Sequence, residues 1–132
     1  MTVPVPTSYE DDLFVIRMAP RALEAAPDAL LIVNKTGEIR AVNAAAVRMT
    51  GWPRVDLLHQ QVEILIPQEL HDRHREAREN YMRQPVERPM GQGLRINMQH
   101  RDGSQIPVEV LLGVLEADDL YVVASIRKVD TE

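Results

Sequence analysis

The last third of the chain alternates apolar and polar residues, and this period of two restricts the possible folds more than any other feature. The alternating runs cover residues 94–99, 106–114 and 120–126, with turn-forming segments "RDGS" and "EADD" between them. Because successive side chains on a strand point to opposite faces, the pattern predicts three antiparallel strands with one buried face. In the longest run, the residues expected to point inward are Val108, Val110 and Leu112.

Two shorter apolar runs lie earlier in the chain, at residues 29–34 and 38–43, on either side of a Lys35-Thr36-Gly37 turn. This arrangement predicts a hairpin. A lone hairpin is barely stable in water, so we expect both groups of strands to join one sheet. The predicted fold is α+β: a five-stranded antiparallel sheet with helices on one face.

The helices expected to cover the sheet lie between the two groups of strands. A helix over residues 44–52 has Asn43 as its N-cap and Gly51 at its C-terminal stop. A short helix follows Pro53, then the brief apolar segment "VEILIP", and then a longer charged helix that ends near Gln84-Pro85. Each of these boundaries follows from capping residues and prolines.

Another short helix precedes the predicted sheet, over residues 9–18, and a second one begins at Pro20 and ends near residue 26. The first helix has too many apolar residues for one narrow stripe, among them Leu13, Phe14 and Ile16. Such a surface usually packs on a partner or on the domain itself. We predict a homodimer in which this patch meets its own copy across a two-fold axis.

Charge and cysteine content exclude several classes of function. The 15 basic and 20 acidic residues give a net charge of −5, which argues against a nucleic-acid-binding surface. The arginines Arg73, Arg75, Arg78 and Arg83 are interspersed with acidic residues, so they are interpreted as a solvated helix face. With no cysteine, the chain has no thiolate metal site and cannot form the adduct of a flavin–cysteine photoreceptor.

No apolar run approaches the ~20 residues that a membrane span needs, so no membrane insertion is expected. The N-terminal segment "MTVPVPTSYEDD" has neither the basic region nor the hydrophobic core of a signal peptide. We therefore expect a soluble cytoplasmic protein.

The charged segment "QELHDRHREARENY" places a histidine on the inward face of the longer helix. At 3.6 residues per turn, Leu70, His74, Ala77 and Tyr81 share one stripe. We therefore expect His74 to be substantially buried, facing the sheet, and Arg75, Glu76 and Glu79 to lie in solvent. An inward imidazole is either a satisfied residue, most commonly hydrogen-bonded to a backbone carbonyl, or a ligand. Although His71 and His74 could chelate a metal, no third ligand is evident, so no metal site is predicted.

Four segments together resemble the PAS sensory domain, over about residues 20–129. They are "ALEAAPDALLIVNKTGEIRAVNAAAVRMTGW", "ILIPQELHDRH", "RPMGQG" and "HRDGSQIPVEVLL". The resemblance implies an N-terminal extension with its helix over 1–19, a PAS domain over 20–129, and the start of a linker over 130–132. It also implies an attached output domain such as a kinase or cyclase, as in bacterial two-component-type signalling. The tail "SIRKVDTE" matches the family's Asp-x-Thr exit motif only loosely, with Lys128 and Asp130 in its place.

The resemblance further implies a small ligand between the long helix and the inner face of the sheet. His74 matches the position of the proximal iron ligand in oxygen-sensing heme PAS domains, whereas Leu94 stands where those domains carry a distal arginine. We expect the protein to purify colourless, with heme on His74 as the alternative. The residues expected to line this cavity are His74, Tyr81, Leu94, Ile96, Met98, Val110, Leu112, Val122 and Ala124.

No catalytic constellation is present, and the chain is not predicted to be an enzyme. Ser8, Ser104 and Ser125 lack the context of a nucleophile motif. The carboxylates of Glu63, Glu69 and Asp72 are interpreted as solvated surface groups rather than an acid–base pair. Two functions stay open: a sensory module that binds a small ligand or relays a signal through dimerisation, and a ligand-free protein-interaction domain.

Overall fold

The computed structural model describes residues 9–84 and 93–129, and residues 9–12 are described by their backbone alone. Its sheet has five antiparallel strands in the order β2-β1-β5-β4-β3. The strand bounds are β1 Ala29–Asn34, β2 Ile39–Val42, β3 Leu94–Gln99, β4 Gln105–Glu116 and β5 Leu120–Lys128. Both predicted groups of strands therefore join one sheet, and the α+β fold is confirmed.

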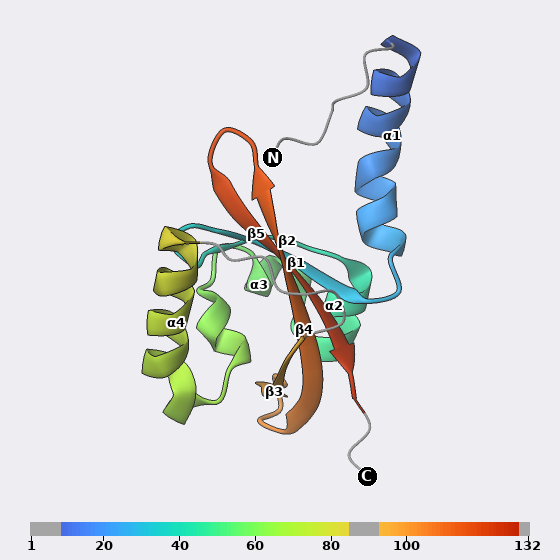
Figure 1. The fold of residues 1–132 in the computed structure, drawn as a ribbon. Helices are drawn as coiled ribbons and strands as arrows, with labels where there is room; N and C mark the ends of the chain where they lie inside the picture. Colours follow the sequence, from blue (N-terminus) through green and yellow to red (C-terminus); the bar gives the residue numbers. More distant parts are fainter. Residues whose placement is uncertain (1–8, 85–92, 130–132) are drawn as a thin grey trace.

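Residues 44–83, between β2 and β3, form the helical layer on one face of the sheet (Figure 1). It comprises α2 Ala44–Thr50, α3 Arg54–Leu57, the 3₁₀ turns η1 Val62–Leu65 and η2 Gln68–Leu70, and α4 His71–Arg83. The remaining helix, α1 Tyr9–Ala25, projects away from these layers and contacts α2 (Figure 1). No helix in the described part of the chain is long and apolar enough to cross a membrane.

The register of the central strands confirms the predicted inward face of β4. Val110 pairs with Leu94 on β3 and with Ile126 on β5, and it is only 9% exposed. Val108 is fully buried, while the neighbouring Leu111 points to the opposite face and is 39% exposed. The core thus lies between this face of the sheet and the helical layer, as period-two alternation requires.

Asn43 joins the first strand to the first helix of the core, and its predicted role as N-cap is confirmed. Its side-chain oxygen accepts hydrogen bonds from the backbone N–H groups of Ala46 and Leu30, both at 3.0 Å. Its amide donates to the carbonyl of Asp28, also at 3.0 Å, and the residue is completely buried. Gly51 ends the same helix in the left-handed conformation, as expected.

The N-terminal helices differ from the prediction of two short helices. A single helix, α1 Tyr9–Ala25, runs through Pro20. Proline has no backbone N–H, so Pro20 cannot donate the helical hydrogen bond to the carbonyl of Ile16, four residues earlier. Because Ile16 is highly exposed, water can satisfy that carbonyl, so the helix continues.

Candidate functional site

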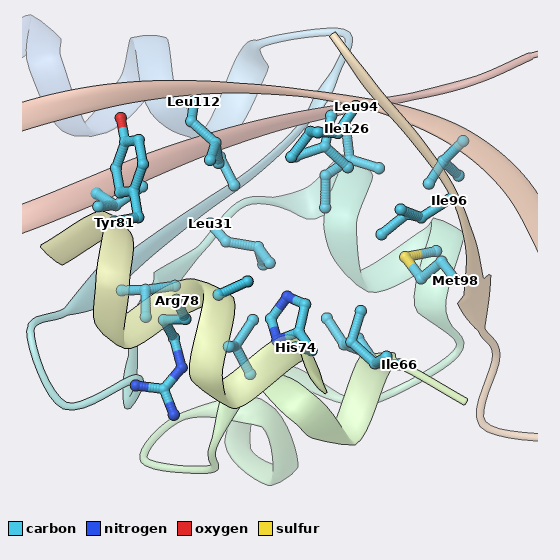
Figure 2. A pocket seen from close by; sticks show the side chains of 18 of the residues that line it. Leu31, Ile66, His74, Arg78, Tyr81, Leu94, Ile96, Met98, Leu112 and Ile126 are labelled. Carbon is cyan, nitrogen blue, oxygen red and sulfur yellow. The ribbon is translucent and has the colours of Figure 1, made fainter. Parts of the chain in front are cut away.

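A cavity of about 200 Å³ lies between α4 and the inner face of the sheet (Figure 2). Its walls are almost entirely apolar. All nine residues expected from the sequence line it: His74, Tyr81, Leu94, Ile96, Met98, Val110, Leu112, Val122 and Ala124. Leu70 shares the helical stripe of His74 but does not reach the cavity.

Further lining residues were missed by the sequence analysis, although part of the signal was available. Leu31 and Val33 lie on the inward face of β1, where the same period-two rule would have placed them. Val108 and Ile126 belong to the inward faces of β4 and β5, which had been identified. The other missed residues come from η1, the segment after it and α4: Val62, Leu65, Ile66 and Arg78. Ala77, on the predicted inward stripe of α4, and Met82 also line the cavity.

His74 contributes an imidazole to the wall of this cavity. Its Nδ1 lies 2.6 Å from Oε2 of Glu63, and its other ring nitrogen is directed into the cavity (Figure 2). The side chain is 32% exposed, so it is half-buried rather than substantially buried as predicted. Its partner is a carboxylate and not a backbone carbonyl; the histidine with a carbonyl partner is His71, 2.7 Å from the oxygen of Ile66.

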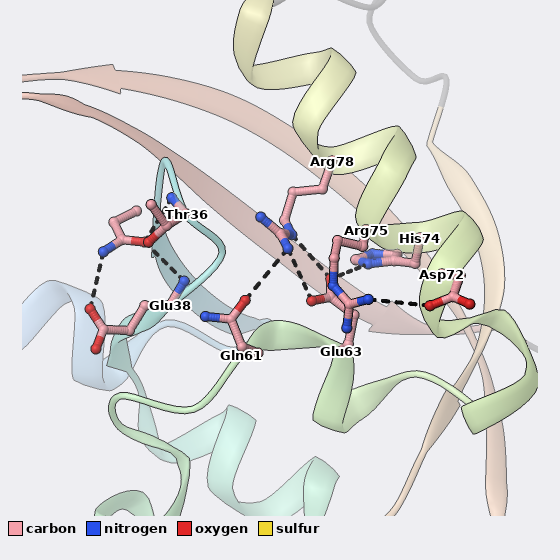
Figure 3. A network of polar contacts seen from close by, with 9 residues as sticks. Thr36, Glu38, Gln61, Glu63, Asp72, His74, Arg75 and Arg78 are labelled. Carbon is pink, nitrogen blue, oxygen red and sulfur yellow. Dashed lines mark hydrogen bonds and ion pairs between the residues drawn. The ribbon is translucent and has the colours of Figure 1, made fainter.

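Glu63 was predicted to be a solvated surface group, and this prediction is wrong. The side chain is only 3% exposed and sits beneath α4, where it meets Arg78 as well as His74 (Figure 3). Arg78 donates from Nε to Oε2 and from Nη2 to Oε1, both at 3.1 Å. The one available signal was the position of Glu63 inside the apolar run "VEILIP".

Arg78 is also misplaced by the sequence analysis, which put it on a solvated face. Its side chain is only 10% exposed, because the bidentate pairing with Glu63 draws the guanidinium under the helix. It lies 3.5 Å from the amide oxygen of Gln61 as well. Its neighbour Arg75 does remain exposed, where it pairs with Asp72 at 3.2 Å.

The charges around Glu63 determine its ionisation. Burial by itself raises the pKa of this carboxyl, but the hydrogen bonds from Arg78 and His74, with their charges, lower it further than burial raises it. The net pKa lies below the usual value, so Glu63 is ionised at neutral pH. An ionised carboxylate only accepts hydrogen bonds, which makes Nδ1 of His74 the donor.

Helix α4 covers the cavity without packing tightly on the sheet. None of its residues is fully buried, and Glu76 and Glu79 are exposed as predicted. The space between helix and sheet explains why His74 and Tyr81 on the inward stripe are only half-buried, and why Ala77 is exposed although it lines the cavity. Polar contacts connect the helix to the segment before it: Glu63 with His74 and Arg78 (Figure 3), and His71 with the carbonyl of Ile66.

Heme can be tested against this geometry. An imidazole whose second nitrogen is held by a carboxylate is well suited to axial iron ligation. The cavity, however, is smaller than the roughly 300–1,000 Å³ typical of sites for drug-sized ligands, and a porphyrin is large among such ligands. Arg78 is the only cation among the described lining residues, and its guanidinium binds Glu63 instead of facing the cavity (Figure 2). The described residues therefore supply an axial ligand but do not fit the macrocycle.

The described ranges also contain no cluster of side chains that could bind a metal ion. No group of three or more histidine, aspartate or glutamate side chains lies close enough there to hold a metal ion. His71 and His74, the pair considered from the sequence, use one nitrogen each for other partners.

Comparisons with known proteins agree with the fold. A family model described as "PAS fold" matches residues 17–128. Among solved structures, the chain is similar to a PAS domain from Colwellia psychrerythraea, with a TM-score of 0.74 and 14% identity. That match covers 87% of this chain and 97% of the other.

Two curated sensor proteins share sequence with the chain. The sensor protein FixL of Bradyrhizobium diazoefficiens is 27% identical over 95 residues, which cover 72% of this chain and 19% of FixL. The oxygen sensor protein DosP of Escherichia coli is 25% identical over 112 residues, which cover 84% of this chain and 14% of DosP. The chain thus spans less than a fifth of the length of either relative.

Proposed function

This chain belongs to the PAS family, and from that premise we propose that it binds a small ligand in the cavity beneath α4 and regulates an attached output domain. A PAS domain is a sensory module and is not itself catalytic. The proposal includes a PAS unit over residues 20–129, a linker that starts at 130–132, a cytoplasmic location and an output such as a kinase or cyclase. The similarity of the chain to the sensor proteins FixL and DosP supports the proposed role in signalling.

The observation that carries the ligand proposal is the composition of the cavity wall. Apolar side chains surround a space of about 200 Å³, and one polar group, the imidazole of His74, is directed into it (Figure 2). Binding sites for small molecules combine a mostly apolar wall with a few placed polar groups. A filled core without ligand function would not need an imidazole at such a position.

We also propose that the domain acts as a homodimer through α1. Three apolar residues of this helix, Leu13, Phe14 and Ile16, are exposed in the isolated chain. Contiguous exposed apolar residues on a helix favour association, and in a two-fold homodimer the same patch of each protomer meets its copy. A dimer through α1 would couple the two sensory domains.

The ligand proposal is tested first by native mass spectrometry and an absorbance scan of the purified protein. The protein is then titrated with toluene as an apolar probe. We expect a colourless protein that either retains a small molecule or binds toluene, with NMR shift changes centred on cavity residues. Replacing Ala124 by Leu should fill the cavity and abolish binding, whereas Val123→Leu on the opposite face of the same strand should not. Absence of both a retained molecule and toluene binding would overturn the proposal. A Soret band lost in His74→Ala would establish heme instead.

A further inference from the structure

We propose that Glu63 fixes the tautomer of His74 so that the cavity selects small apolar molecules whose head group donates a hydrogen bond through an O–H. This inference rests on the ligand cavity proposed above and adds the chemistry of the ligand's polar end. Glu63 does not line the cavity, so its effect passes through His74. It is therefore a positioning residue.

The hydrogen bonds around Glu63 leave only one place for the proton of a neutral imidazole. Oε2 of the carboxylate accepts from Nδ1 of His74 at 2.6 Å and from Nε of Arg78 at 3.1 Å. Oε1 accepts from Nη2 of Arg78 at 3.1 Å. Because the carboxylate has no proton to donate, the imidazole proton must lie on Nδ1. The second nitrogen, Nε2, then carries a bare lone pair.

The groups that face the imidazole on its Nδ1 side are a carboxylate, a guanidinium and an amide. Glu63 on η1 and Arg78 on α4 form a bidentate pair whose charges cancel, and Gln61 adds only a neutral amide. A neutral ligand that donates a hydrogen bond leaves this balance unchanged.

The remaining wall determines what such a ligand looks like. No described residue donates a hydrogen bond to Nε2 of His74, and apart from Arg78 and Tyr81 the other lining residues are apolar. A ligand O–H directed at Nε2 would satisfy that lone pair, while an apolar body would contact the sheet. A ligand of the same shape without a donor would leave Nε2 unpartnered. An engineered apolar cavity of about 150 Å³ binds benzene, so a single-ring molecule suits this space of about 200 Å³.

Nitrogen-15 NMR of the imidazole in the unaltered protein tests the tautomer directly. At a pH of about 8, where an ordinary histidine is neutral, we expect a protonated Nδ1 and an unprotonated Nε2 for His74. The same spectrum contains His59, an exposed histidine, as an internal reference. A proton on Nε2, or on both nitrogens, would overturn the proposal.

Two probes of matched shape test the selectivity. Phenol and toluene have the same ring and differ only in that phenol carries O–H where toluene carries CH₃. We expect phenol to bind about tenfold more tightly than toluene, because its O–H makes one additional hydrogen bond. In Glu63→Gln, the glutamine amide can donate to Nδ1, which moves the imidazole proton to Nε2, so the preference should fall below about threefold. Glu69→Gln changes an exposed carboxylate of the neighbouring turn η2 and should keep the full preference.

Each outcome of the probe experiment is decisive. Equal binding of phenol and toluene to the unaltered protein would overturn the selectivity while leaving the ligand cavity in place. Failure of both probes in a protein that retains no molecule would overturn the cavity and the selectivity with it. If Glu63→Gln does not fold, the tautomer and the phenol preference of the unaltered protein decide the matter by themselves.

Discussion

The guanidinium of Arg78 lies directly against the backbone of Gly37, in the turn between β1 and β2. A Cβ placed on Gly37 would be 2.3 Å from Cζ of Arg78, far inside van der Waals contact. The same guanidinium is held by two hydrogen bonds to Glu63 (Figure 3). This contact links α4, which covers the cavity, to the edge of the sheet.

Replacing Gly37 by Ala should therefore destabilise the fold through Arg78. Gly37 has φ of +87°, and Gly103 has φ of +90° but no atom within 4 Å of its Cβ position. Gly103→Ala is the matched control, because both variants place a side chain at positive φ, which costs about 1–2 kcal/mol. Gly37→Ala should cost about 1–2 kcal/mol more, since the displaced guanidinium leaves Glu63. If urea denaturation shows the same loss of unfolding free energy for Gly37→Ala and Gly103→Ala, the contact with Arg78 does not contribute to stability.

The ionisation of Glu63 should make stability depend on pH. Its pKa is lowered in the folded protein from an unfolded value near 4.5, because Arg78 and His74 donate hydrogen bonds to the charged form. A lowered pKa stabilises the fold above the unfolded value, and this contribution is lost as the pH falls through the folded pKa. The free energy of unfolding should thus fall more steeply below pH ~4.5 in the unaltered protein than in Glu63→Gln.

Urea denaturation at a series of pH values measures this difference. Glu69→Gln, at an exposed position, serves as the control and should follow the unaltered protein. Parallel curves for the unaltered protein and Glu63→Gln across the acidic range would contradict the role assigned to the buried carboxylate.

The strand register can be tested with two adjacent residues of β4. Val110→Asp would bury an unpaired carboxylate between Leu94 and Ile126, which should cost about 2–4 kcal/mol or more. Leu111→Asp places the same group on the exposed face and should cost much less. Thermal unfolding of both variants distinguishes the faces, and similar melting temperatures would mean that the register is wrong.

Loss of the Asn43 side chain should destabilise the core more than loss of an ordinary cap. Asn43→Ala removes the cap of α2 and leaves the partly buried backbone N–H of Leu30 without its partner. The cap alone is worth about 0.5–2 kcal/mol, and the unsatisfied donor adds about 1–3 kcal/mol. Asn97→Ala, at an exposed position of β3, is the control. A cost for Asn43→Ala no larger than that of the control would refute the joint role.

Sedimentation velocity tests the dimer proposed through α1. A truncated variant that begins at Ala19, and a full chain with Phe14→Glu and Ile16→Glu, should both shift toward monomer because the apolar contact is lost. Val55→Glu, which changes an exposed apolar residue on α3, should leave association unchanged. A dimer that persists in both α1 variants would place the interface elsewhere, such as on the outer face of the sheet.

The sequence by itself determined the sheet, the caps of α2 and the inward faces of β3, β4 and β5, because these features depend on neighbours in the chain. A period of two assigns every residue of a strand to a face, and the side chain of Asn43 acts on an N–H only three residues away. The same local reasoning placed His74 on the cavity side of its helix. It could not give the depth of burial, which depends on the gap between α4 and the sheet.

Only the tertiary structure decided where the charges of the site lie. Glu63 and Arg78 are 15 residues apart, and each would be costly to bury alone. Folding brings them together as a bidentate pair, and this compensation permits both to leave solvent, which no local pattern in the chain can reveal. The partner of His74 depends on the same packing, since Glu63 reaches Nδ1 only when η1 lies beneath α4. Local periodicity therefore located the cavity wall, and long-range charge pairing set its chemistry.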